Sequence, residues 1–155
     1  DDSSLTMLGP EQWKWLTKKL SKPTDYRIIV SSIQFIAVGH GWESWKNLPH
    51  ERNKLISLID KSDIKNTIIL SGDRHRGGIY QLKTEKGSTI TEVTSSSLNS
   101  SYPTNPEEAG PLRVGSTFVN ENYGGLYLNN ESDTLTISLK NIEGSYLASI
   151  KVASK

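Results

Sequence analysis

The fold of this 155-residue chain is decided by one stretch, Asn66-Thr67-Ile68-Ile69-Leu70-Ser71-Gly72-Asp73-Arg74-His75. Its apolar beginning predicts a short strand at 66–70 that is covered on both faces. Gly72 allows a tight turn directly after the strand. Asp73 and His75 then follow at alternate positions. Because ligands of open α/β sheets gather outside the carboxyl ends of strands, this pair stands where a functional site is expected.

The residues before this stretch predict the rest of a parallel α/β unit. Pro10 suits the first position of a helix, and we expect a helix over about 10–21. Residues 28–38 are rich in Ile, Val and Phe, which predicts another strand buried on both faces. A second helix is expected from Pro49 to about Asp60. A strand, a helix and a strand in this order are typical of a parallel unit, so the sequence indicates an α/β fold.

The residues after this stretch predict a β-rich region. Apolar residues alternate at 135, 137 and 139 and again at 148, 150 and 152, and Glu143-Gly144 lies between the two sets, which indicates a hairpin. Residues 96–116 are rich in Ser, Asn, Pro and Gly and predict a long loop, which in compact domains is usually functional or mobile. Strands are expected at 78–84, 90–95, 125–128, 134–140 and 146–152.

The overall composition is that of one domain, which we divide into an α/β part at 1–76 with the site loop and a β-rich part at 77–155. The hydrophobic fraction of 34% is low for a self-sufficient domain. A net charge of +1 gives no reason to expect specific nucleic-acid recognition, and no apolar run is long enough to span a membrane. The lack of cysteine excludes disulfides and thiolate metal ligands within this chain. Residues 1–4 lack the basic and apolar regions of a signal peptide.

Asp73 and His75 carry the most specific chemistry in the sequence. A carboxylate and an imidazole can hold divalent or ferric ions. Paired ions of this kind clamp the attacking and leaving oxygens of an in-line phosphoryl displacement. Spacing alone leaves a second interpretation open, in which Asp73 caps a turn and His75 is an ordinary polar loop residue. A serine hydrolase built on Ser71 is disfavoured, since the Gly-x-Ser-x-Gly motif that it needs is absent.

Further residues are candidates for contacts with the substrate or for the outer shell of such a site. His40, between two glycines, could approach a metal or a phosphate, or be a solvent-exposed loop residue. Glu43 could orient a ligand, be exposed, or pair with Arg52. Arg74 or Arg76 could hold a phosphate with its planar fork. Alternate residues of an extended chain face opposite ways, so we expect Arg74 to point away from the candidate ligands and only one arginine to point inward.

Several blocks of this sequence resemble, in order, those of alkaline phosphatase D-like enzymes, which belong to the calcineurin-like metallophosphoesterase superfamily. The sharpest block, Ile69-Leu70-Ser71-Gly72-Asp73-Arg74-His75, resembles the family's last metal-binding block, with aspartate in the first ligand position as in that branch. The other blocks are residues 7–16, 43–45 followed by 49–52, 92–98 and 122–125. Together the blocks are far more specific than any one of them.

The resemblance implies the C-terminal half of a metallophosphoesterase-like αββα sandwich, with two sheets packed face to face and helices outside. It implies a hydrolase of phosphate monoesters or diesters, of the alkaline phosphatase or phosphodiesterase type, that acts on small phosphoester substrates. Asp73 and His75 are carried over as metal ligands. The metals implied are iron and calcium, with zinc or manganese as alternatives. The location implied is extracytoplasmic, either periplasmic or secreted.

The sequence departs from the family pattern in what it lacks. The family's earlier Asp-x-His or Cys-bearing block, its Gly-Asp-x-x-Asp block and its Asn-His block are absent. We therefore expect a C-terminal portion whose remaining ligands come from the N-terminal half of the same domain or from a partner chain. Alone it is expected to be inactive, and its uncovered apolar strands are expected to need a partner or a second copy. The alternative hypothesis is a noncatalytic β-rich binding or interaction module that retains the half-fold.

Overall fold

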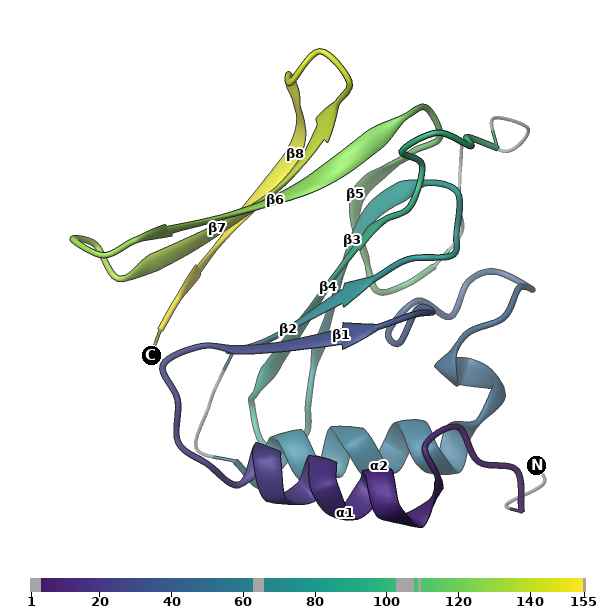
Figure 1. Cartoon of the computed structure of the whole chain (residues 1–155), viewed down its shortest axis with the longest axis vertical. Helices are drawn as coiled ribbons and strands as arrows, with labels where there is room; N and C mark the ends of the chain where they lie inside the picture. The colour runs from purple at the N-terminus through teal and green to yellow at the C-terminus, as the bar shows by residue number, and fades with distance from the viewer. Residues whose placement is uncertain (1–3, 63–65, 103–107, 109, 155) are drawn as a thin grey trace.

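The computed structural model describes residues 4–62, 66–102, 108 and 110–154. Its layers are two α-helices, a five-stranded sheet that we call sheet A, and a three-stranded sheet that we call sheet B (Figure 1). The helices cover one face of sheet A and sheet B packs on the other, and a separate hydrophobic core fills each interface. The fold is therefore α/β with two sheets face to face, as expected. Within the described residues, helices cover sheet A alone.

Helices α1 (Gly9–Leu20) and α2 (Pro49–Asp60) lie together beneath sheet A (Figure 1), and a short 3-10 helix, η1 (Trp45–Asn47), precedes α2. Both α-helices carry a proline in the first turn, where its missing N–H is not needed, and both confirm the predicted positions. No helix in the described part of the chain is long and apolar enough to cross a membrane. The buried apolar side chains of α1, η1 and α2 are Trp13, Leu20, Trp45, Leu55 and Ile59.

Sheet A has the strand order β1 (Arg27–Ser31), β2 (Asn66–Ser71), β4 (Thr89–Ser95), β3 (Gly77–Lys83) and β5 (Arg113–Phe118). Strands β1, β2 and β4 run parallel, whereas β3 is antiparallel to both of its neighbours. The parallel pairing of β1 with β2 across α2 confirms the predicted unit. It also brings the carboxyl ends of β1, β2 and β4 to one end of the sheet.

Sheet B is an antiparallel meander of β6 (Asn122–Asn129), β7 (Thr134–Asn141) and β8 (Tyr146–Ala153). The β7–β8 hairpin turns where the sequence predicts it, and Gly144, at φ 84°, supplies the left-handed residue of the turn. The predicted alternation on β7 is confirmed by burial. The side chains that face sheet A there, with their exposed fractions, are Leu135 (5%), Ile137 (1%) and Leu139 (0%).

The strand predicted at 28–38 is shorter than expected, and it has an exposed apolar face, in line with the expectation of uncovered apolar strands. β1 ends at Ser31, and the side chains of Ile28 and Val30 are 44% and 79% exposed. Residues 33–37 are buried, but in an irregular segment rather than in a strand. Backbone N–H groups of this segment bond to a side chain instead of a neighbouring strand, and apolar periodicity cannot reveal such a partner.

Glu92 on β4 holds this irregular segment in place. One carboxylate oxygen accepts the N–H of Phe35 at 2.7 Å, and the other accepts those of Ile36 at 2.6 Å and Ala37 at 3.2 Å. The Glu92 side chain is 0% exposed. Burial raises its pKa, although the three backbone donors oppose the shift. Three buried donors therefore depend on one carboxylate.

The loop predicted at 96–116 ends earlier than expected, because β5 begins at Arg113. Gly115, at φ 74°, interrupts the alternation that would have indicated a strand. Residues 103–107 and 109 of this loop lie outside the described residues.

Replacing Glu92 by glutamine tests its role. The amide nitrogen of Glu92→Gln cannot accept a hydrogen bond, so at least one of the buried N–H groups loses its partner. We expect the free energy of unfolding to fall by about 1–3 kcal/mol in urea titrations. The control is Glu131→Gln at an exposed position, which should change it by less than about 0.5 kcal/mol. Equal effects of the two substitutions would contradict the assignment.

Candidate functional site

The candidate ligands Asp73 and His75 lie in the short loop between β2 and β3, at the carboxyl end of β2. Both side chains are exposed, and within the described part of the chain neither forms a hydrogen bond or an ion pair. Both residues have left-handed backbone, with φ of 63° and 52°. That conformation costs roughly 1–2 kcal/mol for a residue with a Cβ, although Asp and His adopt it more often than most. Strained residues cluster at functional sites, so the loop has a second feature of such a site.

Side chains in and just after β4 hold this loop. The hydroxyl of Ser96 accepts the N–H of Arg74 at 2.8 Å and lies 3.5 Å from the carbonyl of Arg76. Two residues earlier, on β4, the Thr94 hydroxyl is 2.8 Å from that of Ser71, the last residue of β2. The Ser71 hydroxyl is therefore engaged in a structural hydrogen bond. The loop is held at both ends, which leaves its two left-handed residues little room to relax.

Both arginines of the loop turn towards the carboxylate of Glu108. Arg74 Nη2 lies 2.6 Å from Glu108 Oε2, and Arg76 Nε lies 3.3 Å from the same oxygen. All of these side chains are nearly buried. The expectation that only one of the two arginines points inward is therefore wrong, because the carboxylate of Glu108 binds both of them and the spacing could not reveal this partner.

Glu108 is the partner that sequence reasoning missed, and no motif in the predicted loop marks it. Its other oxygen, Oε1, accepts the hydroxyl of Tyr80 at 3.3 Å. Burial, with the charge of Glu108 added, raises the pKa of the Tyr80 hydroxyl, so Tyr80 remains a donor. The result is a buried cluster, which we call the arginine cluster, of Arg74, Arg76, Tyr80 and Glu108.

His40 borders the arginine cluster. Its Nδ1 accepts the N–H of Trp42 at 3.1 Å, while its Nε2 is buried and has no hydrogen-bond partner among the described residues. Burial and the charge of Arg74 lower the pKa of His40, and Glu108 opposes them. His40 is thus a half-buried residue rather than a solvent-exposed one.

Glu43 is exposed, and the structure does not pair it with Arg52. The guanidinium of Arg52 donates instead to the carbonyl of Phe35 at 2.8 Å and to that of Ile36 at 3.4 Å. Arg52 therefore supports the carbonyls of the same segment whose N–H groups bind Glu92. Glu43 stands outside this network.

The two downstream sequence blocks meet beside the loop. Asn122, which is 1% exposed, donates its N–H to the carbonyl of Ser97 at 3.0 Å and accepts the hydroxyl of Ser95 at 3.1 Å. A Cβ at Gly77 would come within 2.9 Å of Asn122 Oδ1, so this approach requires glycine. These residues join sheet B to sheet A.

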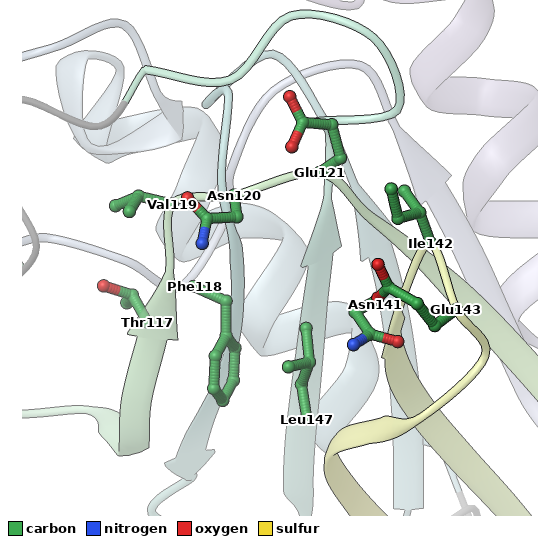
Figure 2. A pocket seen from close by; sticks show the side chains of 9 residues that line it. All are labelled: Thr117, Phe118, Val119, Asn120, Glu121, Asn141, Ile142, Glu143 and Leu147. Atoms are coloured by element: carbon green, nitrogen blue, oxygen red, sulfur yellow. The ribbon is translucent and has the colours of Figure 1, made fainter.

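The structure brings Arg74, Arg76 and His40 together, but it does not complete a metal site. Within the described residues, no group of three or more His, Asp and Glu side chains could hold a metal ion. A pocket of about 410 Å³ lies between the end of β5 and the β7–β8 hairpin, and none of the predicted site residues lines it (Figure 2). Its lining residues are Thr117, Phe118, Val119, Asn120, Glu121, Asn141, Ile142, Glu143 and Leu147.

Comparisons with known proteins add independent information. A family model described as PhoD-like phosphatase matches residues 1–144. The chain is 26% identical over 97 residues to alkaline phosphatase D of Bacillus subtilis (strain 168), a match that covers 57% of this chain and 17% of that protein. A solved structure of PhoD superposes with a TM-score of 0.72 at 16% identity, over 94% of this chain and 32% of that one. The chain therefore spans less than a third of either known protein.

Glycine substitution tests the strain in the loop. Because glycine adopts positive φ without a steric cost, Asp73→Gly should be more stable than Asp73→Ala by about 1 kcal/mol in urea titrations. The matched control is Asn53 on the exposed face of α2, where alanine should be the more stable substitute by a similar amount. The same order at both positions would argue against a left-handed Asp73.

The lowered pKa of His40 predicts a dependence of stability on pH. The unfolded chain binds a proton to His40 more readily than the folded chain does. The contribution of His40 to stability is therefore complete above its unfolded pKa of about 6.5 and is lost as the pH falls below it. Between about pH 7.5 and 5.5, His40→Gln should lose less stability than the wild type. An unchanged slope in His40→Gln would refute the assignment.

Proposed function

The chain belongs to the PhoD-like phosphatase family, and from this premise we propose that it forms part of a metal-dependent phosphoester hydrolase. The observation that carries the proposal is the pair Asp73 and His75. Two side chains able to bind metal are exposed and form no hydrogen bond or ion pair with any described residue, in a strained loop at the carboxyl end of a parallel strand. Two left-handed residues whose exposed side chains contact no described partner are typical of a functional loop rather than of a purely structural one.

The donor atoms of this pair fit a metal ion. A carboxylate oxygen and an imidazole nitrogen suit iron, zinc and manganese, and the carboxylate suits calcium. Iron and calcium are the metals that the family resemblance favours. Two donors are too few for a complete coordination shell, and no third described carboxylate or imidazole joins them. We therefore propose that the remaining ligands come from the rest of a PhoD-like domain, in the same polypeptide or in a partner chain.

The residues of this chain would position the metal and the substrate. Bound metal ions in such a site activate water and neutralise charge on the phosphoryl oxygens. Asp73 and His75 would hold donor atoms at the end of β2, where a small phosphate monoester or diester can reach them. His40 and Arg76 would act behind the loop as outer-shell groups, with the charge of Arg76 balanced by Glu108. Glu43 would orient a ligand from the exposed rim of the site. The enzyme would work outside the cytoplasm.

The second candidate function is a noncatalytic β-rich binding or interaction module. One feature of the arginine cluster favours this function. The carboxylate of Glu108 already binds both guanidinium groups, which a catalytic site would use to hold a phosphate. Such a module would keep the half-fold without binding a metal at Asp73 and His75.

Manganese titration of the chain, followed by NMR, separates the two functions. Mn²⁺ broadens signals only near its binding site, so a weak site is detectable at a Kd of about 1 mM. We expect the amide signals of residues 72–76 to broaden first. Asp73→Ala and His75→Ala should each remove the effect, and the chain without further ligands should show no turnover of an aryl phosphate.

The control for this titration is Glu131→Ala, an exposed carboxylate far along the sequence in the β6–β7 turn, which should leave the broadening unchanged. Broadening centred elsewhere, or retained in both loop variants, would favour the noncatalytic module. Robust hydrolysis by the chain alone with added iron and calcium would refute the partial-shell proposal.

A further inference from the structure

The pocket of about 410 Å³ has no part in the proposed hydrolase, and its lining combines an apolar floor with an acidic rim. Its walls come from the end of β5, the residues that join β5 to β6, and the β7–β8 hairpin (Figure 2). β5 is the edge strand of sheet A opposite β1, and β8 is an edge strand of sheet B. The pocket therefore lies at the β5 edge of the sandwich, and its volume is in the range of about 300–1,000 Å³ that small-molecule sites have.

The floor of the pocket is apolar and is fixed by the fold. Phe118 and Leu147 line it, and both side chains are half-buried because they pack against the core between the two sheets. Phe118 pairs with Gly77 at the start of β3. Its neighbour Thr117 accepts a hydrogen bond from Arg76 Nη1 at 3.3 Å. These contacts hold the end of β5, so the floor is formed before any ligand binds.

The rim of the pocket carries two carboxylates, those of Glu121 and Glu143. In Figure 2 both carboxylates lie above the side chains of Phe118 and Leu147. Within the described part of the chain, neither carboxylate forms an ion pair. None of the nine described residues that line the pocket is Lys, Arg or His. The pocket is therefore locally negative, although the whole chain has a net charge of +1.

Hydrogen bonds within the chain set the positions of the rim residues. Glu121 Oε1 accepts the hydroxyl of Ser101 at 3.1 Å. Asn141 Oδ1 accepts the N–H of Ser145 at 2.8 Å, which closes the turn that carries Glu143. Glu121 Oε2 and both carboxylate oxygens of Glu143 accept no hydrogen bond from the described residues. Three carboxylate oxygens at the rim are thus available to a ligand.

An apolar floor beneath two such carboxylates fits an organic cation. The negative potential of the rim attracts a positive group, and the face of the Phe118 ring attracts it as well. An apolar group on the same ligand gains free energy when it leaves water for contact with Phe118 and Leu147. A calcium ion fits less well, because it requires about six to eight oxygen ligands and the floor is hydrocarbon.

We propose that this pocket binds a small organic ammonium ion that carries an apolar or aromatic group. The ammonium group lies between Glu121 and Glu143, and the apolar group lies on Phe118 and Leu147. The inference goes beyond the proposed function, because the pocket contains neither Asp73 nor His75 and can be occupied with or without a metal at that pair.

Titration with phenethylammonium, followed by NMR in the presence of EDTA, tests the pocket. This probe joins an aromatic ring to a primary ammonium group. We expect the amide signals of residues 118–121 and 141–144 to shift, with a Kd of about 1 mM or lower. Binding should weaken as salt is raised to about 0.5 M, since salt screens the charges at the rim. The anionic analogue 3-phenylpropanoate should leave these signals unchanged.

Substitutions at the rim test the role of the two charges. Glu121→Gln and Glu143→Gln keep the shape of each side chain and remove its charge. Each should weaken binding of phenethylammonium by about two- to fivefold, which is the gain expected of an exposed ion pair. The matched control is Glu131→Gln, an exposed residue of the β6–β7 turn that does not line the pocket. It should bind as the wild type does, and all of these variants should keep the wild-type circular dichroism.

Three results would overturn the proposal. They are the absence of shifts at these amides, equal binding of 3-phenylpropanoate, and an unchanged affinity when Glu121→Gln and Glu143→Gln are combined. In a second sample without EDTA, calcium that shifts the same amides at lower concentration than phenethylammonium would also overturn it in favour of a metal ion. Because EDTA keeps Asp73 and His75 free of metal in the first sample, failure here is distinct from failure of the metal-binding proposal.

Discussion

Three consecutive backbone N–H groups, from Phe35 to Ala37, converge on the buried carboxylate of Glu92, and the geometry of the site depends on this contact. The segment after β1 would otherwise continue as a strand, since it is apolar. Glu92 instead satisfies its backbone donors within the interior, which is the condition for burying irregular chain. The chain can then turn away from sheet A and bring His40 beside Arg74.

The strand that carries Glu92 organises the whole carboxyl end of sheet A. Successive residues on one face of a strand are two apart, and on β4 this face changes from apolar to polar towards the site. Ile90 packs in the helix-facing core, and Glu92 binds the segment after β1. Thr94 bonds to the last residue of β2, and Ser96 bonds to the loop with Asp73 and His75. One strand face therefore positions two segments of the candidate site, the segment after β1 and the loop after β2.

Sequence patterns predicted the parts of the fold that depend on neighbours along the chain. Proline placed α1 and α2, an apolar run gave β2, and alternation gave β7 and β8. The patterns failed where a distant partner decides the conformation. β1 stops early because the carboxylate of Glu92 binds the residues that follow it, and both Arg74 and Arg76 point inward because the carboxylate of Glu108 binds both of them. The loop with Asp73 and His75 was predictable because it follows the end of β2. The role of Glu108 was not predictable, because it belongs to a loop without a motif.

The exposed apolar face of β1 and the incomplete ligand pair are related through the direction of the strands. β1 and β2 are parallel, so their carboxyl ends lie at the same end of sheet A, where Asp73 and His75 follow β2. A strand that joins β1 in parallel would also end there, and the residues that follow it would lie on the same side as the pair. Covering Val30 and bringing further ligands to Asp73 would then be one structural event. The apolar contact would supply the free energy of association, and the polar loops would supply the chemistry.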